Sequence, residues 1–186
     1  MVDETKTLIA GKRILAVDDE EDILETIEDI LDEARLDLQR DYQSALERIN
    51  TRQYDLAILD IMGVDGIKLL DAAVARGIPT IMLTAHAVSP EMLMQSIRKG
   101  AIAYLPKETL ADLDTLLLEI LRAHAEGQPV WKILFNKLGK YFDERFGSGW
   151  QEKDREFWND FNRTCQISIG IGERLRHDPK VGARGI

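Results

Sequence analysis

Acidic, hydroxyl and amine side chains follow several short apolar runs of this sequence. Asp18 and Asp19 come directly after the run RILAV, and Asp60 ends the run LAILD. Thr84 ends TIMLT, and Lys107 comes shortly after AIAYL. A carboxylate at the end of an apolar run is expensive to bury unless another group compensates its charge. These residues are therefore candidates for a site in which opposite charges and hydrogen-bond donors meet.

The types of these side chains point to phosphoryl-transfer chemistry. Carboxylates that lie close together repel each other, and oxygen ligands without Cys or His select a hard cation such as Mg²⁺. A carboxylate can itself attack phosphorus and form an acyl phosphate. The new phosphoryl group then needs a metal ion, a cationic side chain and a hydroxyl donor around it. Lys107 and Thr84 are of the right types to supply the cation and the hydroxyl.

The pattern of the first part of the chain predicts how these residues are positioned. Short β-prone runs alternate with segments whose apolar residues recur at helical spacing. The runs span residues 13–17, 36–40, 56–60, 80–84 and 101–105. Successive βα units predict a parallel sheet with helices on both faces, and ligands bind such a sheet beyond the carboxyl ends of its strands. The candidate residues should therefore share one rim of the sheet.

Several stretches together resemble the receiver domain of two-component response regulators. They are ILAVDDEEDI, LAILDIMGVDG, IMLTAH and GAIAYLPKE, which occur in the order that is usual in that family. The resemblance covers about residues 12 to 125. It implies an α/β, flavodoxin-like fold, in which a doubly wound parallel sheet of five strands has the order 2-1-3-4-5.

The resemblance also implies a role for each residue at the rim. Asp60 resembles the phosphoryl acceptor, and Asp19 and Asp60 would bind Mg²⁺ through their side chains. Met62 would add its backbone carbonyl, and Asp18 would hold a metal-bound water. Lys107 would pair with Asp60 or with its phosphoryl group. Taken without the other residues, Asp18 and Asp19 would also suit the N-terminal end of a helix.

Thr84 and Tyr104 resemble the switch pair of the family. Thr84 would move to hydrogen-bond the phosphoryl group, and Tyr104 would follow it inward. In the family this motion reshapes the face formed by the fourth helix, the fifth strand and the fifth helix. The implied partner is a sensor histidine kinase or a phosphotransfer protein, and a homodimer could form through this face or through the C-terminal segment. His86 suits a solvated loop better than a role in phosphate lifetime.

Two departures from the family pattern concern the loops beside the site. The loop DIMGVDG after Asp60 is shorter than the usual D-x-x-M-P-x-x-D-G and lacks its proline. The family lysine usually precedes a proline in a cis peptide, whereas here Pro106 precedes Lys107 and Glu108 follows it. Because a cis bond to a residue other than proline costs about 2.5–4 kcal/mol, Lys107–Glu108 should be trans.

Residues 127–186 show no resemblance to an output domain that can be named, and they predict a mainly helical extension. A Gly/Pro break at 126–130 precedes two amphipathic aromatic segments, and residues 165–172 are β-prone. The aromatic and apolar positions are Trp131, Leu134, Phe135, Leu138, Tyr141 and Phe142, then Trp150, Phe157, Trp158 and Phe161. Such faces must be covered. The extension is therefore either a helical hairpin docked on the receiver or on a partner protomer, or an output element released or presented on phosphorylation.

The predicted organisation is an N-terminal arm (1–11), a receiver domain (12–126) and an aromatic-rich helical extension (127–186). Charged residues make up 31% of the chain, and no apolar run reaches the ~20 residues that a membrane span needs. One cysteine allows no intrachain disulfide, and the N-terminus does not resemble a secretory signal, so a cytoplasmic location is expected. The net charge of −9 is concentrated in residues 1–126, which makes nucleic-acid binding unexpected.

Three functions fit these observations to different degrees. The favoured one is a phosphorylation-switched signalling protein, which is not expected to be an enzyme and catalyses only the transfer and hydrolysis of its own phosphoryl group. The second is a DNA-binding transcriptional regulator that acts through the tail. The third is a Mg²⁺-dependent phosphohydrolase that works through an aspartyl phosphate, but such enzymes usually need an acid two residues after the nucleophile, where this chain has Met62. A receiver that folds without being phosphorylated is a further alternative.

Overall fold

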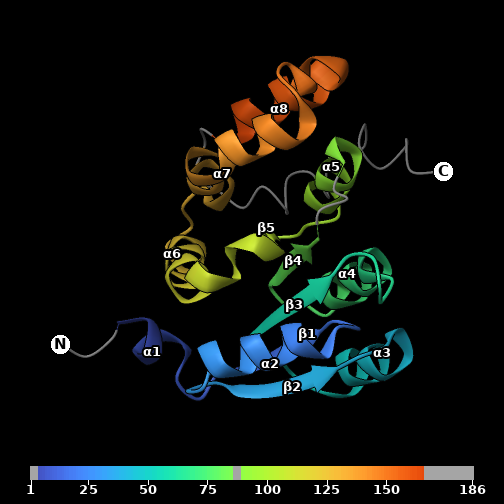
Figure 1. Ribbon diagram of the computed structural model, residues 1–186, viewed down its shortest axis with the longest axis vertical. Coiled ribbons are helices and arrows are strands. Elements are labelled where there is room, and N and C mark those ends of the chain that lie inside the picture. Colours follow the sequence, from blue (N-terminus) through green and yellow to red (C-terminus); the bar gives the residue numbers. More distant parts are fainter. Residues whose placement is uncertain (1–3, 86–88, 166–186) are drawn as a thin grey trace.

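A computed structural model of the protein describes residues 4–85 and 89–165. Five parallel strands form one sheet in the order β2-β1-β3-β4-β5 (Figure 1). The strands are β1 (Arg13–Val17), β2 (Arg35–Gln39), β3 (Leu56–Asp60), β4 (Thr80–Thr84) and β5 (Ala103–Pro106). The order and the parallel pairing confirm the predicted flavodoxin-like α/β fold.

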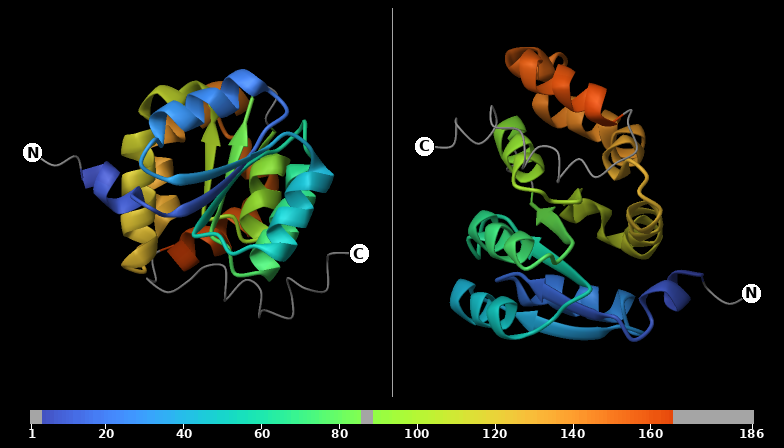
Figure 2. Two further views of the ribbon diagram at one scale, coloured as in Figure 1. Left: turned by 90° about the horizontal axis from the view of Figure 1, so that it is seen from below. Right: turned by 180° about the vertical axis from the view of Figure 1, so that it is seen from behind.

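Helices cover both faces of the sheet (Figures 1 and 2). Helices α2 (Glu21–Ile30) and α6 (Leu113–Ala125) lie on one face, and a short 3₁₀ helix, η1 (Lys107–Asp112), leads from β5 into α6. The opposite face carries α3 (Tyr42–Thr51), α4 (Gly66–Ala75) and α5 (Pro90–Arg98). Each of these helices turns an apolar stripe toward the sheet, as in α2, where Leu24 and Ile27 are buried.

The burial of the strands follows their place in the sheet. Every residue of β3 and of β4 is buried, as is expected for central parallel strands that are covered on both faces. The edge strand β2 is mostly half-buried. Two strands differ slightly from the prediction, because β2 begins and ends one residue earlier than expected and β5 begins only at Ala103.

The N-terminal arm that was predicted over residues 1–11 is partly helical. It contains a short helix, α1 (Glu4–Ile9), which packs against α6. Ile9 is 1% exposed and is part of the main core. A single buried side chain at the end of a polar segment leaves too weak a periodic pattern for this helix to be predicted from the sequence.

The C-terminal extension forms two further helices on one side of the receiver (Figure 1). They are α7 (Val130–Phe146) and α8 (Arg155–Cys165), joined through a 3₁₀ helix, η2 (Trp150–Asp154). This agrees with the predicted pair of amphipathic segments. No helix within 4–85 and 89–165 has the length and apolar character needed to cross a membrane. His86 and positions 166–172 of the β-prone run lie outside the described residues.

Candidate functional site

The strand register brings the candidate residues to one rim of the sheet. Val17 pairs with Leu59 between β1 and β3, so Asp18 follows directly beside Asp60. Between β3 and β4, Asp60 pairs with Leu83, which places Thr84 one position beyond it. Between β4 and β5, Thr84 pairs with Pro106, the residue that precedes Lys107. The register thus places the carboxylates, the Thr84 hydroxyl and the Lys107 ammonium side by side along the carboxyl ends of the strands.

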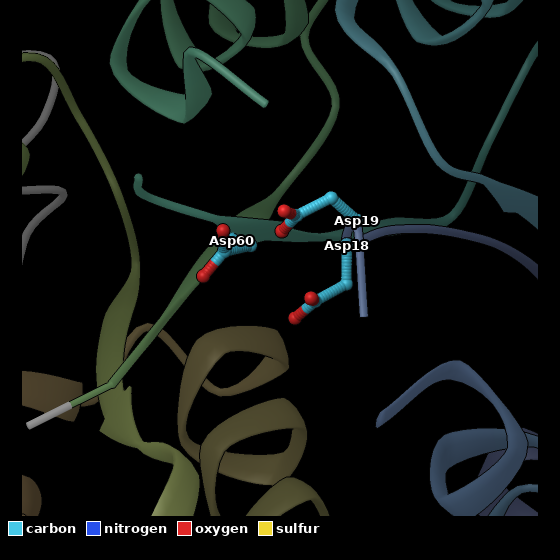
Figure 3. Close-up of side chains that lie close together, drawn as sticks. All are labelled: Asp18, Asp19 and Asp60. Atoms are coloured by element: carbon cyan, nitrogen blue, oxygen red, sulfur yellow. The ribbon is translucent and has the colours of Figure 1, made fainter. Parts of the chain in front are cut away.

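Three carboxylates converge at this rim (Figure 3). One oxygen each of Asp18, Asp19 and Asp60 lies within 4.8 Å of the others. Asp18 and Asp60 are buried, whereas Asp19 is exposed. An all-oxygen set with one solvent-facing member suits a hard divalent cation that keeps several of its water ligands, as Mg²⁺ does. The donor set therefore fits the metal that the family resemblance implies.

Lys107 faces the acidic residues, as the sequence predicted. Its Nζ lies 2.8 Å from Oδ2 of Asp18, 3.2 Å from Oδ1 of Asp60 and 2.6 Å from Oε1 of Glu20. Burial alone would lower the pKa of Lys107, but the hydrogen bonds to Asp18 and Glu20 and the charge of Asp60 raise it. The side chain is therefore a permanent cation at the site, and it compensates the charge of the buried carboxylates.

Asp18 is the most completely buried acid at the rim, with no exposed surface. Its Oδ1 accepts a hydrogen bond from the backbone N–H of Glu20 at 3.0 Å. Burial raises the pKa of Asp18, although the bonds from Lys107 and from the Glu20 amide lower it in part. Burial thus disfavours the charged form of Asp18, and the donors Lys107 and the Glu20 amide offset only part of this cost.

The shortened loop after Asp60 closes tightly around the site. The backbone N–H of Gly63 donates to Oδ2 of Asp60 at 2.8 Å, which fixes the carboxylate opposite Lys107. A Cβ at Gly63 would overlap the carboxylate of Asp19, and a Cβ at Gly66 would overlap the backbone carbonyl of Asp60. The loop therefore depends on glycine at both places. Although this loop is two residues shorter than the family pattern, the three carboxylates still converge.

Thr84 and Tyr104 lie beside the site in buried positions. Thr84 is 3% exposed, and its hydroxyl donates to the carbonyl of Ala85 over a long 3.3 Å. Tyr104 is fully buried, and this burial raises the pKa of its phenol. The ring of Tyr104 is thus enclosed in the core, against the Phe142 ring of the C-terminal extension.

Several features of the site were not predicted from the sequence. In the sequence, Glu20 is only one member of an acidic run, yet it forms the shortest of the three ion pairs of Lys107. Gly63 stands out in the sequence only as part of a short loop. The side chain of Met62 is 66% exposed, and its backbone carbonyl stays a predicted metal ligand. All peptide bonds among the described residues are trans, which confirms the prediction for Lys107–Glu108.

Comparisons with known proteins agree with this geometry. A family model described as "Response regulator receiver domain" matches residues 14–120. Two-component response regulator ARR10 of Arabidopsis thaliana is 36% identical over 104 residues, which are 52% of this chain and 19% of that protein. Its relative ARR12 is 33% identical over 121 residues, or 61% of this chain and 20% of that protein. The chain thus spans about a fifth of the length of these relatives.

Solved structures show the same likeness. A CheY-like response regulator receiver domain protein from Methanospirillum hungatei is 29% identical, with a TM-score of 0.55, and the match covers 63% of this chain and 99% of that one. The signal receiver domain of an HD domain-containing protein from Pseudomonas fluorescens is 27% identical, with a TM-score of 0.53, over 62% of this chain and 95% of that one. With its sheet order, its acidic rim and a match over more than half its length, the chain belongs to the response regulator receiver domain family.

Proposed function

We propose that this protein is a cytoplasmic signalling protein of a two-component phosphorelay, in which Asp60 accepts a phosphoryl group and the protein then changes its protein contacts. The observation that carries the proposal is the position of Asp60. Its carboxylate is buried at the end of a central strand, 3.2 Å from the Lys107 ammonium and beside two further carboxylates.

The reaction that this geometry suits is a direct transfer. A carboxylate oxygen of Asp60 attacks the phosphorus of a phosphohistidine in the donor protein, the new O–P bond forms, and the N–P bond breaks with its electron pair left on the histidine nitrogen. Asp60 then carries close to two negative charges in place of one. Lys107 stays cationic and can follow the added charge on its flexible stem. The Gly63 N–H holds the carboxylate in its orientation.

The acidic residues of the rim would hold Mg²⁺ during this transfer. Asp19 and Asp60 would bind it through their side chains, Met62 through its backbone carbonyl, and Asp18 through a water molecule. When it is bound, the ion supplies charge neutralisation for the transferring phosphoryl group. The convergence of three carboxylate oxygens within 4.8 Å supports this assignment.

The signal would leave the site through Thr84 and Tyr104. Thr84 would turn its hydroxyl from Ala85 to the phosphoryl oxygen, and Tyr104 would respond to that movement. The donor would be a sensor histidine kinase or a phosphotransfer protein. Turnover would be limited to the protein's own phosphoryl group, because the position of a leaving-group acid is taken by Met62, which is exposed and cannot donate a proton.

Intact mass measurement tests this proposal. We expect one added phosphate after incubation of the wild type with Mg²⁺ and acetyl phosphate, and none on Asp60→Asn. The matched control is Asp71→Asn, because Asp71 is an aspartate that pairs with Lys99 away from the site. This control should gain one phosphate. A wild type that gains none, or an Asp60→Asn variant that is still phosphorylated, would overturn the proposal.

A further inference from the structure

The helix pair α7–α8 of the C-terminal extension lies against one side of the receiver (Figures 1 and 2). The receiver elements that it contacts include β5, η1, α6 and α5. An apolar side of α7 is buried there, and its members are Val130, Trp131, Leu134, Leu138 and Phe142. The polar side chains of α7 that border this buried side are thereby held at defined places beside the receiver.

Two of these polar side chains of α7 contact Glu108. Oε1 of Glu108 accepts a hydrogen bond from Nη2 of Arg145 at 3.2 Å and one from the Tyr141 hydroxyl at 3.3 Å. The Arg145 guanidinium also lies 5.4 Å from the centre of the Tyr141 ring. Side chains at this spacing lie on the same side of a helix. The three side chains, here called the Glu108 cluster, thus join α7 to the first turn of η1.

Glu108 directly follows the lysine of the phosphorylation site. Lys107 begins η1, and its Nζ extends across the end of β4 to lie 3.2 Å from Oδ1 of Asp60. Before Lys107, the ring of Pro106 restricts the backbone, and the Pro106 carbonyl accepts a hydrogen bond from the Thr109 hydroxyl at 2.7 Å. After Lys107, the family pattern has a proline and this chain has Glu108. Glu108 has no ring, so its position is restrained through its side chain, by the contacts with α7.

We infer that the Glu108 cluster positions Lys107 for the phosphorylation of Asp60, so that the C-terminal extension completes the phosphorylation site of its own receiver. This inference rests on the proposed function. The stem of Lys107 is flexible, so the place of its ammonium depends on how firmly the backbone beneath it is held. A small misplacement of a catalytic group is enough to slow a reaction. Tyr141 and Arg145 are therefore positioning residues, which act on Lys107 through Glu108.

The expected effect is moderate because the Glu108 cluster is partly exposed. The side chain of Arg145 is 43% exposed and that of Glu108 is 29% exposed. Ion pairs of this kind are screened by solvent and salt. Lys107 also keeps its other ion pairs at the rim, which limit how far its ammonium can move. Loss of the Glu108 cluster should therefore slow the phosphorylation of Asp60 by about fivefold and not abolish it.

The rate of phosphorylation of the full-length chain tests the inference. Intact mass would be followed over time with Mg²⁺ and acetyl phosphate for Glu108→Gln, Arg145→Gln and the double variant. We expect each single variant to be slower than the wild type by about fivefold. The double variant should be no slower than either, because both substitutions break the same contact. Arg145→Lys keeps the charge and should retain most of the wild-type rate.

The direction of the two effects separates positioning from attraction of the anionic donor. Glu108→Gln removes a negative charge near the site, whereas Arg145→Gln removes a positive one. If these charges acted only by attracting or repelling acetyl phosphate, the first variant would be faster than the wild type and the second slower. If they position Lys107, both variants are slower.

Lys137→Gln is the matched control. Lys137 of α7 pairs with Glu119 of α6 at 2.7 Å, and its side chain is 42% exposed, close to the value for Arg145. This variant removes an ion pair between the same helix and the receiver but keeps the Glu108 cluster, so it should keep the wild-type rate. Hydrogen exchange of the η1 amides, measured by mass spectrometry without acetyl phosphate, should be faster in Arg145→Gln than in Lys137→Gln.

Several results would overturn the positioning role and leave the proposed function intact. They are wild-type rates in both single variants, effects of opposite sign, a double variant that shows the sum of the single effects, an equal loss in Lys137→Gln, or η1 exchange that is the same in Arg145→Gln and Lys137→Gln. If the wild type gains no phosphate on Asp60, the proposed function fails and the positioning role fails with it.

Discussion

Lys107 Nζ lies 3.2 Å from Asp60 Oδ1, although β4 separates β3, which ends at Asp60, from β5, which ends directly before Lys107. The lysine begins η1 directly after β5, and its long side chain reaches across the end of β4 to the acidic residues. The proline that precedes Lys107, in place of one that follows it, does not prevent this reach. The Lys107 ammonium offsets the desolvation cost of burying the Asp60 carboxylate at the end of β3.

Replacement of Lys107 by alanine should slow phosphorylation of Asp60 by about a hundredfold, because the site loses the cation that balances the developing phosphoryl charge. The rate would be measured as a time course of intact mass with Mg²⁺ and acetyl phosphate. Lys99→Ala removes a comparable ion pair, with Asp71, outside the site and should keep the wild-type rate. A Lys107→Ala rate within twofold of the wild type would show that the ammonium has no part in the transfer.

Asp18→Asn should raise the melting temperature at neutral pH in metal-free buffer. Because burial raises the pKa of Asp18, the stability this group contributes is complete below its unfolded pKa and is lost as the pH rises through the folded pKa. Asparagine does not titrate, so the gain should be present at about pH 7 and vanish near pH 4. Asp41→Asn is a control in which the effect on the melting temperature has the opposite sign. The hydrogen bond from the Ser44 amide lowers the pKa of Asp41, so its replacement should lower the melting temperature at neutral pH. A Tm difference for Asp18→Asn that does not depend on pH would contradict this account.

Gly63→Ala should weaken Mg²⁺ binding by roughly tenfold to a hundredfold, because the added methyl group must displace the Asp19 carboxylate. Isothermal titration with Mg²⁺ measures the affinity directly. Gly139→Ala is the control, since a Cβ at that position in α7 meets nothing within 4 Å. It should leave the affinity unchanged and stabilise the helix by up to about 1 kcal/mol. Equal affinities for wild type and Gly63→Ala would show that Asp19 is not needed for the metal.

Phe142→Ala should lower the free energy of unfolding of the helix pair α7–α8 by about 3–5 kcal/mol. The reason is that the Phe142 ring is buried between Tyr104 of the receiver and the aromatic side chains of the pair. All three tryptophans lie in this segment, so their emission in a urea titration reports on it. For Phe142→Ala we expect a red shift of the tryptophan emission and a lower urea concentration at the midpoint of unfolding. Lys140→Ala, on the solvent side of the same helix, should superimpose on the wild type. An unshifted midpoint for Phe142→Ala would mean that this ring carries little of the docking.

Much of the receiver could be predicted because its pattern is local. Asp60 and Thr84 end apolar runs that form β3 and β4 with the predicted bounds. Parallel strands bring their carboxyl ends together in this topology, so the common rim followed from the strand assignments alone. The convergence of Asp18, Asp19, Asp60 and Lys107 confirms that prediction.

The rest depends on contacts between segments that are distant in the sequence. The pairing of Glu20 with Lys107 requires the reach of a flexible side chain, which no spacing rule gives. The fit of Asp19 against Gly63 depends on a backbone approach that becomes visible only when both loops are placed. The amphipathic face of α7 indicated that something must cover it, but the contact with Tyr104 is set by tertiary packing.

Only residues 126–129 separate the end of α6 at Ala125 from the start of α7 at Val130. So short a tether keeps the aromatic helix pair within reach of α5 and β5 at a local concentration of the order of millimolar. Any other protein that binds this face must compete with the tethered helix pair α7–α8, whose local concentration does not fall on dilution. A partner that binds this face must therefore displace the tethered helix pair, and its affinity has to exceed what that intramolecular contact supplies.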